Sequence, residues 1–104
     1  MRELENTFHR AMIGVYENAR EHDYFAIYFK RMIDEFGGVS AAKRLLAKPE
    51  IQKGLTKLWE LDLLDQSMEA LVIQERFQPL FSETEIAEAR RRLLGLGYFE
   101  EDLD

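Results

Sequence analysis

Residues 24–47 read YFAIYFKRMIDEFGGVSAAKRLLA, and this stretch decides the fold. Apolar side chains recur in its first half at the three- and four-residue spacing of a helix. This spacing predicts a helix from Tyr24 to about Glu35, with Asp23 as its N-cap. The Gly37-Gly38 pair tolerates positive φ and therefore predicts the end of that helix and a turn. The small and apolar residues that follow predict a short helix from Val39 to Ala47.

The predicted helix of residues 24–35 is apolar over most of its circumference. One face is expected to lie in the core and carries Phe25, Phe29, Met32, Ile33 and Phe36. Tyr24, Ile27 and Tyr28 extend the apolar surface well beyond that face. A helix of this kind is usually central in its fold or covered by another chain. The residues expected to contact a protein partner or a second copy of this chain are therefore Tyr24, Ile27, Tyr28 and Arg31.

Helices are also predicted on both sides of this stretch. Upstream, apolar side chains recur from Leu4 to Ala19 and predict an amphipathic helix from Arg2 to about Glu21. Downstream, Pro49 suits a first helical turn and predicts a helix from there to about Leu61. The side chains that this second helix is expected to bury are Ile51, Leu55, Leu58 and Trp59.

The C-terminal part of the chain contains two serines at predicted helix starts, Ser67 and Ser82. Asp65 or Ser67 is expected to cap a short helix through residues 68–73. A turn is predicted from Arg76 to Phe81, where Pro79 prevents a continuous helix and where Phe77, Leu80 and Phe81 enter the core. The residues Ser82 to Glu85 match a capping box and predict a last helix from Glu83 to Leu94. Its inward side chains are expected to be Ile86, Ala89, Leu93 and Leu94.

Length and composition fit a single helical domain. The chain has 104 residues, of which 46% are hydrophobic, and this is enough for one modest core. No stretch alternates apolar and polar residues between hairpin turns, so a sheet is not expected. We therefore predict a compact all-α bundle of five or six helices over residues 1–104, with an acidic tail from about residue 99.

Several classes of protein are excluded or disfavoured by the same composition. The chain has no Cys, which excludes disulfides, thiolate metal sites and cysteine nucleophiles. Charges near the N-terminus interrupt any apolar run, so neither a signal peptide nor a membrane-spanning helix is predicted. These features favour a cytoplasmic location and disfavour a membrane partner.

Charge is distributed unevenly along the chain. Residues 39–58 carry five basic side chains and one acidic one, whereas residues 59–104 carry four basic and twelve acidic ones. Acidic C-terminal helices could neutralise the basic segment, or its lysines could simply be solvated. Alternatively, the segment is a helix-turn-helix that binds nucleic acid. The contact residues in that case are Lys43, Arg44, Lys48, Lys53 and Lys57.

The sequence gives little support to catalysis. His9 lies one helical turn after Glu5, and this pair offers at most two metal ligands without the further carboxylates of a dinuclear site. His22 lies beside Asp23 at a helix junction, where a capping or surface role is expected. No serine lies in a Gly-x-Ser-x-Gly turn and Gly37-Gly38 lacks the rest of a phosphate-binding loop. We therefore predict no enzymatic activity, no metal site and no cofactor.

A series of motifs spans nearly the whole chain. It comprises Phe8, Ala11-Met12, Tyr24, Phe29, Met32, residues 37–46, Gly54, Leu58-Trp59-Glu60, Leu64-Asp65, residues 69–72, Leu80-Phe81 and Glu85. With these motifs the chain resembles a family of short bacterial all-α proteins for which no activity is established. Gln66 departs from the family pattern, which usually has an apolar residue there. The resemblance implies a bacterial cytoplasmic domain, and the function predicted from the residues is binding through the aromatic helix.

Overall fold

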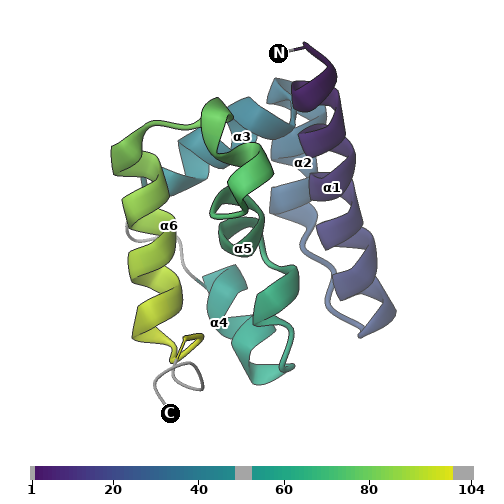
Figure 1. Cartoon of the computed structure of the whole chain (residues 1–104). Coiled ribbons are helices and arrows are strands. Elements are labelled where there is room, and N and C mark those ends of the chain that lie inside the picture. Colours follow the sequence, from purple (N-terminus) through teal and green to yellow (C-terminus); the bar gives the residue numbers. More distant parts are fainter. Residues whose placement is uncertain (1, 49–52, 100–104) are drawn as a thin grey trace.

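Helices account for the regular structure in the computed structural model, which describes residues 2–48 and 53–99 (Figure 1). In chain order the elements are α1 (Arg2–Glu21), α2 (Ile27–Phe36), α3 (Gly38–Leu46), α4 (Lys53–Glu60), the 3-10 helix η1 (Leu64–Gln66), α5 (Met68–Val72), the 3-10 helix η2 (Glu75–Leu80) and α6 (Glu83–Gly95). Within the two described ranges there is no strand, so the predicted all-α fold is confirmed. The predicted helix start at Pro49, the burial of Ile51 and the acidic residues 100–104 lie outside the described residues.

The main core lies where α1 meets α3, α5 and η2. Phe8 of α1 is fully buried, and its ring packs edge-on against the rings of Phe77 and Phe81, with centroids 5.0 and 5.2 Å away. Edge-to-face pairs add to the free energy gained by burying the rings. The predicted burial of Phe77, Leu80 and Phe81 is confirmed. The other buried members of this cluster are Met12, Met32, Ile33, Ala41, Ala42, Leu45, Leu46, Met68, Val72 and Ala89.

Helices α1 and α3 approach each other closely at Gly38. A Cβ atom there would lie 2.6 Å from the Cα of His9, so any side chain would force the two backbones apart. The Gly38 N–H also donates a hydrogen bond of 2.9 Å to Nδ1 of His9. Helix α3 begins at Gly38, one residue before its predicted start at Val39. The predicted turn is made by Gly37, whose φ is 85°.

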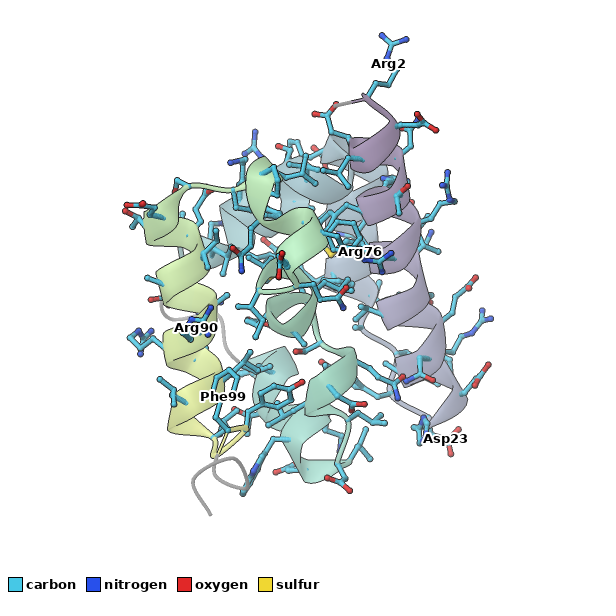
Figure 2. All side chains as sticks on the ribbon, viewed as in Figure 1. Arg2, Asp23, Arg76, Arg90 and Phe99 are labelled. Atoms are coloured by element: carbon cyan, nitrogen blue, oxygen red, sulfur yellow. The ribbon has the colours of Figure 1, made fainter. Side chains whose placement is uncertain are left out.

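Asp23 ends α1 instead of starting α2. Its φ of 63° lies in the left-handed region, and the N–H of Tyr24 donates to the carbonyl of Ala19, which closes the helix. Figure 2 shows Asp23 at this turn, at the end of α1. The predicted cap and the predicted helix start at Tyr24 are therefore wrong. Helix α2 begins at Ile27, with Ala26 at the N-cap position and no side-chain capping bond.

Three apolar side chains that the sequence placed inside are exposed, namely Phe25, Trp59 and Leu94, at 55, 50 and 58%. Phe25 precedes α2 and so does not share its inward face. Trp59 lies on the short helix α4, which packs mainly against η1 and leaves one side open. On α6 the inward position beside Leu93 is taken by Arg92, and Leu94 turns to solvent.

The predicted serine caps are confirmed and fix the starts of α5 and α6. Ser67 Oγ accepts a hydrogen bond of 3.1 Å from the N–H of Ala70. Ser82 and Glu85 form the predicted capping box, because each side chain accepts a bond from the other residue's N–H. The predicted turn around Pro79 is the 3-10 helix η2.

Among the described helices, none has the length and apolar character that crossing a membrane requires.

Candidate interaction site

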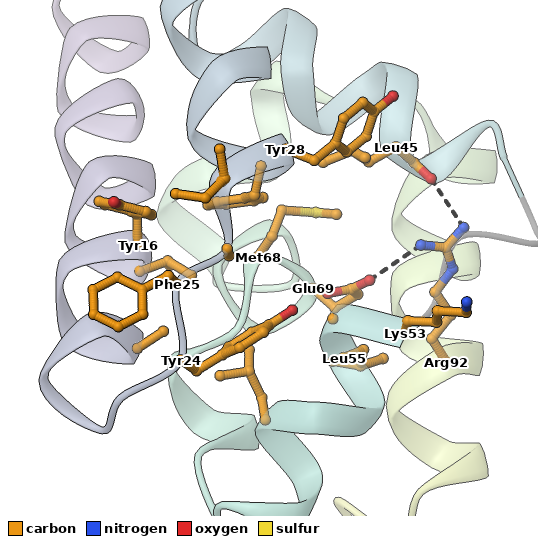
Figure 3. A pocket seen from close by; sticks show the side chains of 17 residues that line it. Tyr16, Tyr24, Phe25, Tyr28, Leu45, Lys53, Leu55, Met68, Glu69 and Arg92 are labelled. Carbon is orange, nitrogen blue, oxygen red and sulfur yellow. Dashed lines mark hydrogen bonds and ion pairs between the residues drawn. The ribbon is translucent and has the colours of Figure 1, made fainter.

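An open groove lies between the C-terminal half of α1, residues 24–29 and the helices α4 and α5 (Figure 3). Its volume is about 470 Å³, within the range of small-molecule sites. The walls are largely apolar and include Val15 and Ala19 of α1, Leu55 and Leu58 of α4 and Met68 of α5. Leu45 of α3 and Arg92 of α6 complete the lining.

Aromatic and aliphatic side chains of residues 24–28 form the exposed part of the groove. Ile27 is 53% exposed and Tyr28 is 49% exposed, and both line the groove together with Phe25. Tyr24 is half-buried, and its hydroxyl would lie 3.4 Å from a Cβ atom placed on Gly54 of α4. Burial raises the pKa of Tyr24 above its ordinary value. Three of the four predicted partner contacts, Tyr24, Ile27 and Tyr28, thus line the same groove.

Arg31, the fourth predicted contact, is exposed on α2 but does not line the groove. It lies four residues after Ile27 and three after Tyr28, so all three share one side of the helix. A surface that includes Arg31 therefore extends from the groove edge along α2.

A buried ion-pair network lies at one end of the groove. Arg92 is 2% exposed, and its Nη1 donates to Glu69 at 3.1 Å while its Nε donates to Glu88 at 2.7 Å. Its Nη2 donates to the backbone carbonyls of Leu45, Leu46 and Lys48 at the end of α3. Arg92 therefore joins α3, α5 and α6, and Figure 3 shows its bonds to Glu69 and to Leu45.

The two carboxylates around Arg92 have opposite pKa shifts. Burial raises the pKa of Glu69, and the hydrogen bond and charge of Arg92 only partly oppose this effect. Glu88 lies near the surface, where hydrogen bonds from Arg91 and then from Arg92 lower its pKa to about 2. The network thus pairs the guanidinium groups of Arg91 and Arg92 with the carboxyl groups of Glu69 and Glu88.

Among the described residues that line the groove, Lys53 is the one charged residue outside this network. Its side chain is exposed at the start of α4, and among the described residues it forms no ion pair. Figure 3 shows it at the end of the groove that also holds Glu69 and Arg92. The groove is thus apolar along its walls and positively charged at one end.

The five basic residues proposed for nucleic-acid contact have different surroundings. Lys43 pairs with Glu85 of α6 at 2.8 Å, as expected if acidic C-terminal helices neutralise the basic segment. Lys57 pairs with Glu60 at 3.9 Å, and the Arg44 guanidinium lies 3.8 Å from the ring centroid of Phe36. Lys48 and Lys53 are exposed. Helix α3 packs mainly on α1, α2 and α6, whereas α4 packs mainly on η1.

The two histidines have structural hydrogen bonds. His9 Nδ1 accepts from the Gly38 N–H, which leaves only its Nε2 for any ligand, and Glu5 lines the same shallow surface depression. His22 Nδ1 lies 3.0 Å from the carbonyl oxygen of Asn18. In the part of the chain that the structure describes, no three His, Asp or Glu side chains are grouped as metal ligands would be.

Sequence reasoning missed Arg92 and Glu69, although both left a signal. Glu69 lies within the apolar run of residues 68–73, and Arg92 lies three residues after Ala89, on the inward face of its helix. An ionisable residue at an inward position is rarely buried without a partner. Searching the inward positions for opposite charges would have suggested this pair.

No family model, curated protein or solved structure matches the chain. The resemblance to a family of short bacterial proteins therefore stays a prediction.

Proposed function

We propose that this chain is a non-enzymatic cytoplasmic interaction module that needs no cofactor. It binds a protein partner, either another protein or a second copy of itself, through residues 24–31. The observation that carries the proposal is the exposure of Phe25, Ile27 and Tyr28. They are three of the five large apolar side chains that are exposed among the described residues, and they fall within four consecutive positions. They therefore form one patch and not a scattered set.

Burial of this patch would favour association. Each of the three side chains has about half of its surface exposed, and removing that half from water stabilises a complex by about 1 kcal/mol per side chain. Tyr28 and Arg31 are also residue types that often dominate the binding energy of protein interfaces. Lys30, the other cation nearby, already pairs with Asp34 at 3.0 Å, so Arg31 is the better contact for an acidic partner residue.

The self-association form of the proposal is tested by molar mass. We expect light scattering with size-exclusion chromatography to show a mass above that of the monomer, rising with protein concentration. Tyr28→Glu should return the protein to a monomer, because the new carboxylate would be buried without a partner. Trp59→Glu is the matched control and should leave the mass unchanged, since Trp59 has the same exposure outside the groove. A wild-type protein that is monomeric at high concentration would exclude self-association.

Nucleic-acid binding through Lys43, Arg44, Lys48, Lys53 and Lys57 is the alternative, and it has less support. Lys43 and Lys57 are engaged in ion pairs, and a net charge of −6 opposes approach to phosphates. If this alternative holds, duplex DNA or RNA is retained at low salt and released steeply as salt rises. Absence of retention at low ionic strength ends it.

A further inference from the structure

We propose that the groove binds a single-chain anionic amphiphile, with the hydrocarbon chain along the apolar walls and a carboxylate head group at Lys53. This ligand is separate from the protein partner proposed above, although both would contact Ile27 and Tyr28. The inference rests on the shape, the lining and the charge of the groove. It would add a small-molecule site to an interaction module.

The walls of the groove match a hydrocarbon chain. Side chains from α1, α4 and α5 line it, no buried side-chain nitrogen or oxygen among the described residues lacks a hydrogen-bond partner, and Met68 supplies a flexible, polarisable wall. A volume of about 470 Å³ is adequate for one small ligand. Apolar surface of this kind gains about 0.8 kcal/mol for each methylene group that it removes from water.

Charge selects the head group. Among the described residues, three charged side chains line the groove, namely Lys53, Glu69 and Arg92. Glu69 and Arg92 are bonded to each other at 3.1 Å, and each of the three guanidinium nitrogens of Arg92 already donates a hydrogen bond within the protein. Lys53 is therefore the group that meets the head group of a ligand. One ammonium complements one negative charge, which favours a monoanion such as a carboxylate over a neutral or cationic head group.

The geometry also separates Lys53 from the other basic residues. Lys57 is four residues further along α4, carries the same charge and is exposed, but it pairs with Glu60 and does not line the groove. Gly54 lies in the lining beside Tyr24, and a large side chain there would enter the groove. These two positions provide a matched control and a means of blocking the site.

The test compares decanoate, 1-decanol and decylammonium as probes of equal chain length, each below its micelle-forming concentration. Binding is measured by calorimetry and by NMR shifts of the Met68 methyl group on the full chain. We expect decanoate to bind about tenfold more tightly than decylammonium, with decanol between them. The Met68 signal should move with all three probes.

Variants locate the head group and the chain. Lys53→Glu should reverse the order of the three probes, whereas Lys57→Glu should leave it unchanged. Gly54→Leu should abolish binding of all three while circular dichroism shows the same helical content. Absence of saturable binding to the wild-type chain overturns the proposal, and so does an order of affinity that Lys53→Glu does not alter. Binding retained by folded Gly54→Leu overturns it as well, because the probes then bind elsewhere.

The outcome can be separated from that of the proposed function. Lys53→Glu leaves residues 24–31 intact, so it should not change self-association. Arg31→Glu alters that surface outside the groove and should weaken association without changing the order of the probes.

Discussion

The two halves of α1 are packed differently: the N-terminal half contacts its neighbours closely, and the C-terminal half borders the groove. In the N-terminal half, the backbone of His9 lies against Gly38 so closely that no side chain fits between them, and the Phe8 ring is fully enclosed. In the C-terminal half, Val15 and Ala19 are also buried but line the groove, and the bulky side chains of Phe25, Ile27 and Tyr28 on the groove stay about half in solvent. α1 therefore lies in the packed core along its N-terminal half and forms one wall of the groove along its C-terminal half. The difference arises from the size of the residues placed opposite it.

Truncating one aromatic ring in each region, Phe8 in the core and Phe25 at the groove, should give the largest difference in stability. Phe8→Ala should lower the free energy of unfolding by about 4 kcal/mol, because it leaves a cavity between Phe77 and Phe81. Phe25→Ala should cost only about 1 kcal/mol, since about half of the Phe25 side chain is already in water. Urea denaturation of both variants measures the contrast. Equal losses would show that the two ends are packed alike.

The second-largest loss in the free energy of unfolding is expected from breaking the ion-pair network around Arg92. Arg92→Met leaves Glu69 buried without its cation and should lower the free energy of unfolding by about 3 kcal/mol. Adding Glu69→Leu to this variant should restore much of the loss, because the uncompensated charge is then gone. Glu75→Leu, at an exposed position, is the control for the second change and should restore nothing. Denaturation curves of the two double variants therefore decide whether the charge is the cause.

The smallest expected effect is the contribution of Glu88 to the pH dependence of stability. The pKa of Glu88 is lowered to about 2 in the folded protein, so the ionised carboxylate favours folding above its ordinary pKa. That contribution is lost as the pH falls from about 5 towards 2 and, given the screening of a group near the surface, amounts to about 1 kcal/mol. Glu88→Gln should be less stable than wild type at pH 7 and should lose less stability on acidification. Parallel pH profiles of the two proteins would contradict this assignment.

Local signals in the sequence were sufficient for much of the fold. The capping box at Ser82 and the apolar stripe of α1 depend on residues three or four positions apart, so spacing alone predicts them. Asp23 was assigned wrongly because aspartate suits both an N-cap and the left-handed turn that ends α1. Helix α3 starts at Gly38, one residue before the predicted start. The sequence could not show this, because the Gly38 N–H donates to His9, which is distant in sequence.

The candidate site was predictable only in part. Ile27 and Tyr28 could be identified because an apolar surface that extends around a helix is visible in the sequence. The groove could not be, because it is lined by segments far apart in the chain. Arg92 is buried only because Glu69, Glu88 and the end of α3 converge on it. The sequence had grouped Lys53 with the other lysines, and its place in the groove lining follows only from the folded arrangement of the segments.

Site-specific photo-crosslinking most directly tests the claim that residues 24–31 are the contact surface. A photoreactive phenylalanine analogue is placed at Tyr28 in one variant and at Trp59 in another, and both are irradiated in host cells and as purified protein. The account predicts one discrete covalent product from position 28, either a dimer of the chain or an adduct with one protein, and none from position 59. Products of equal yield from both positions, or none from position 28, would contradict it.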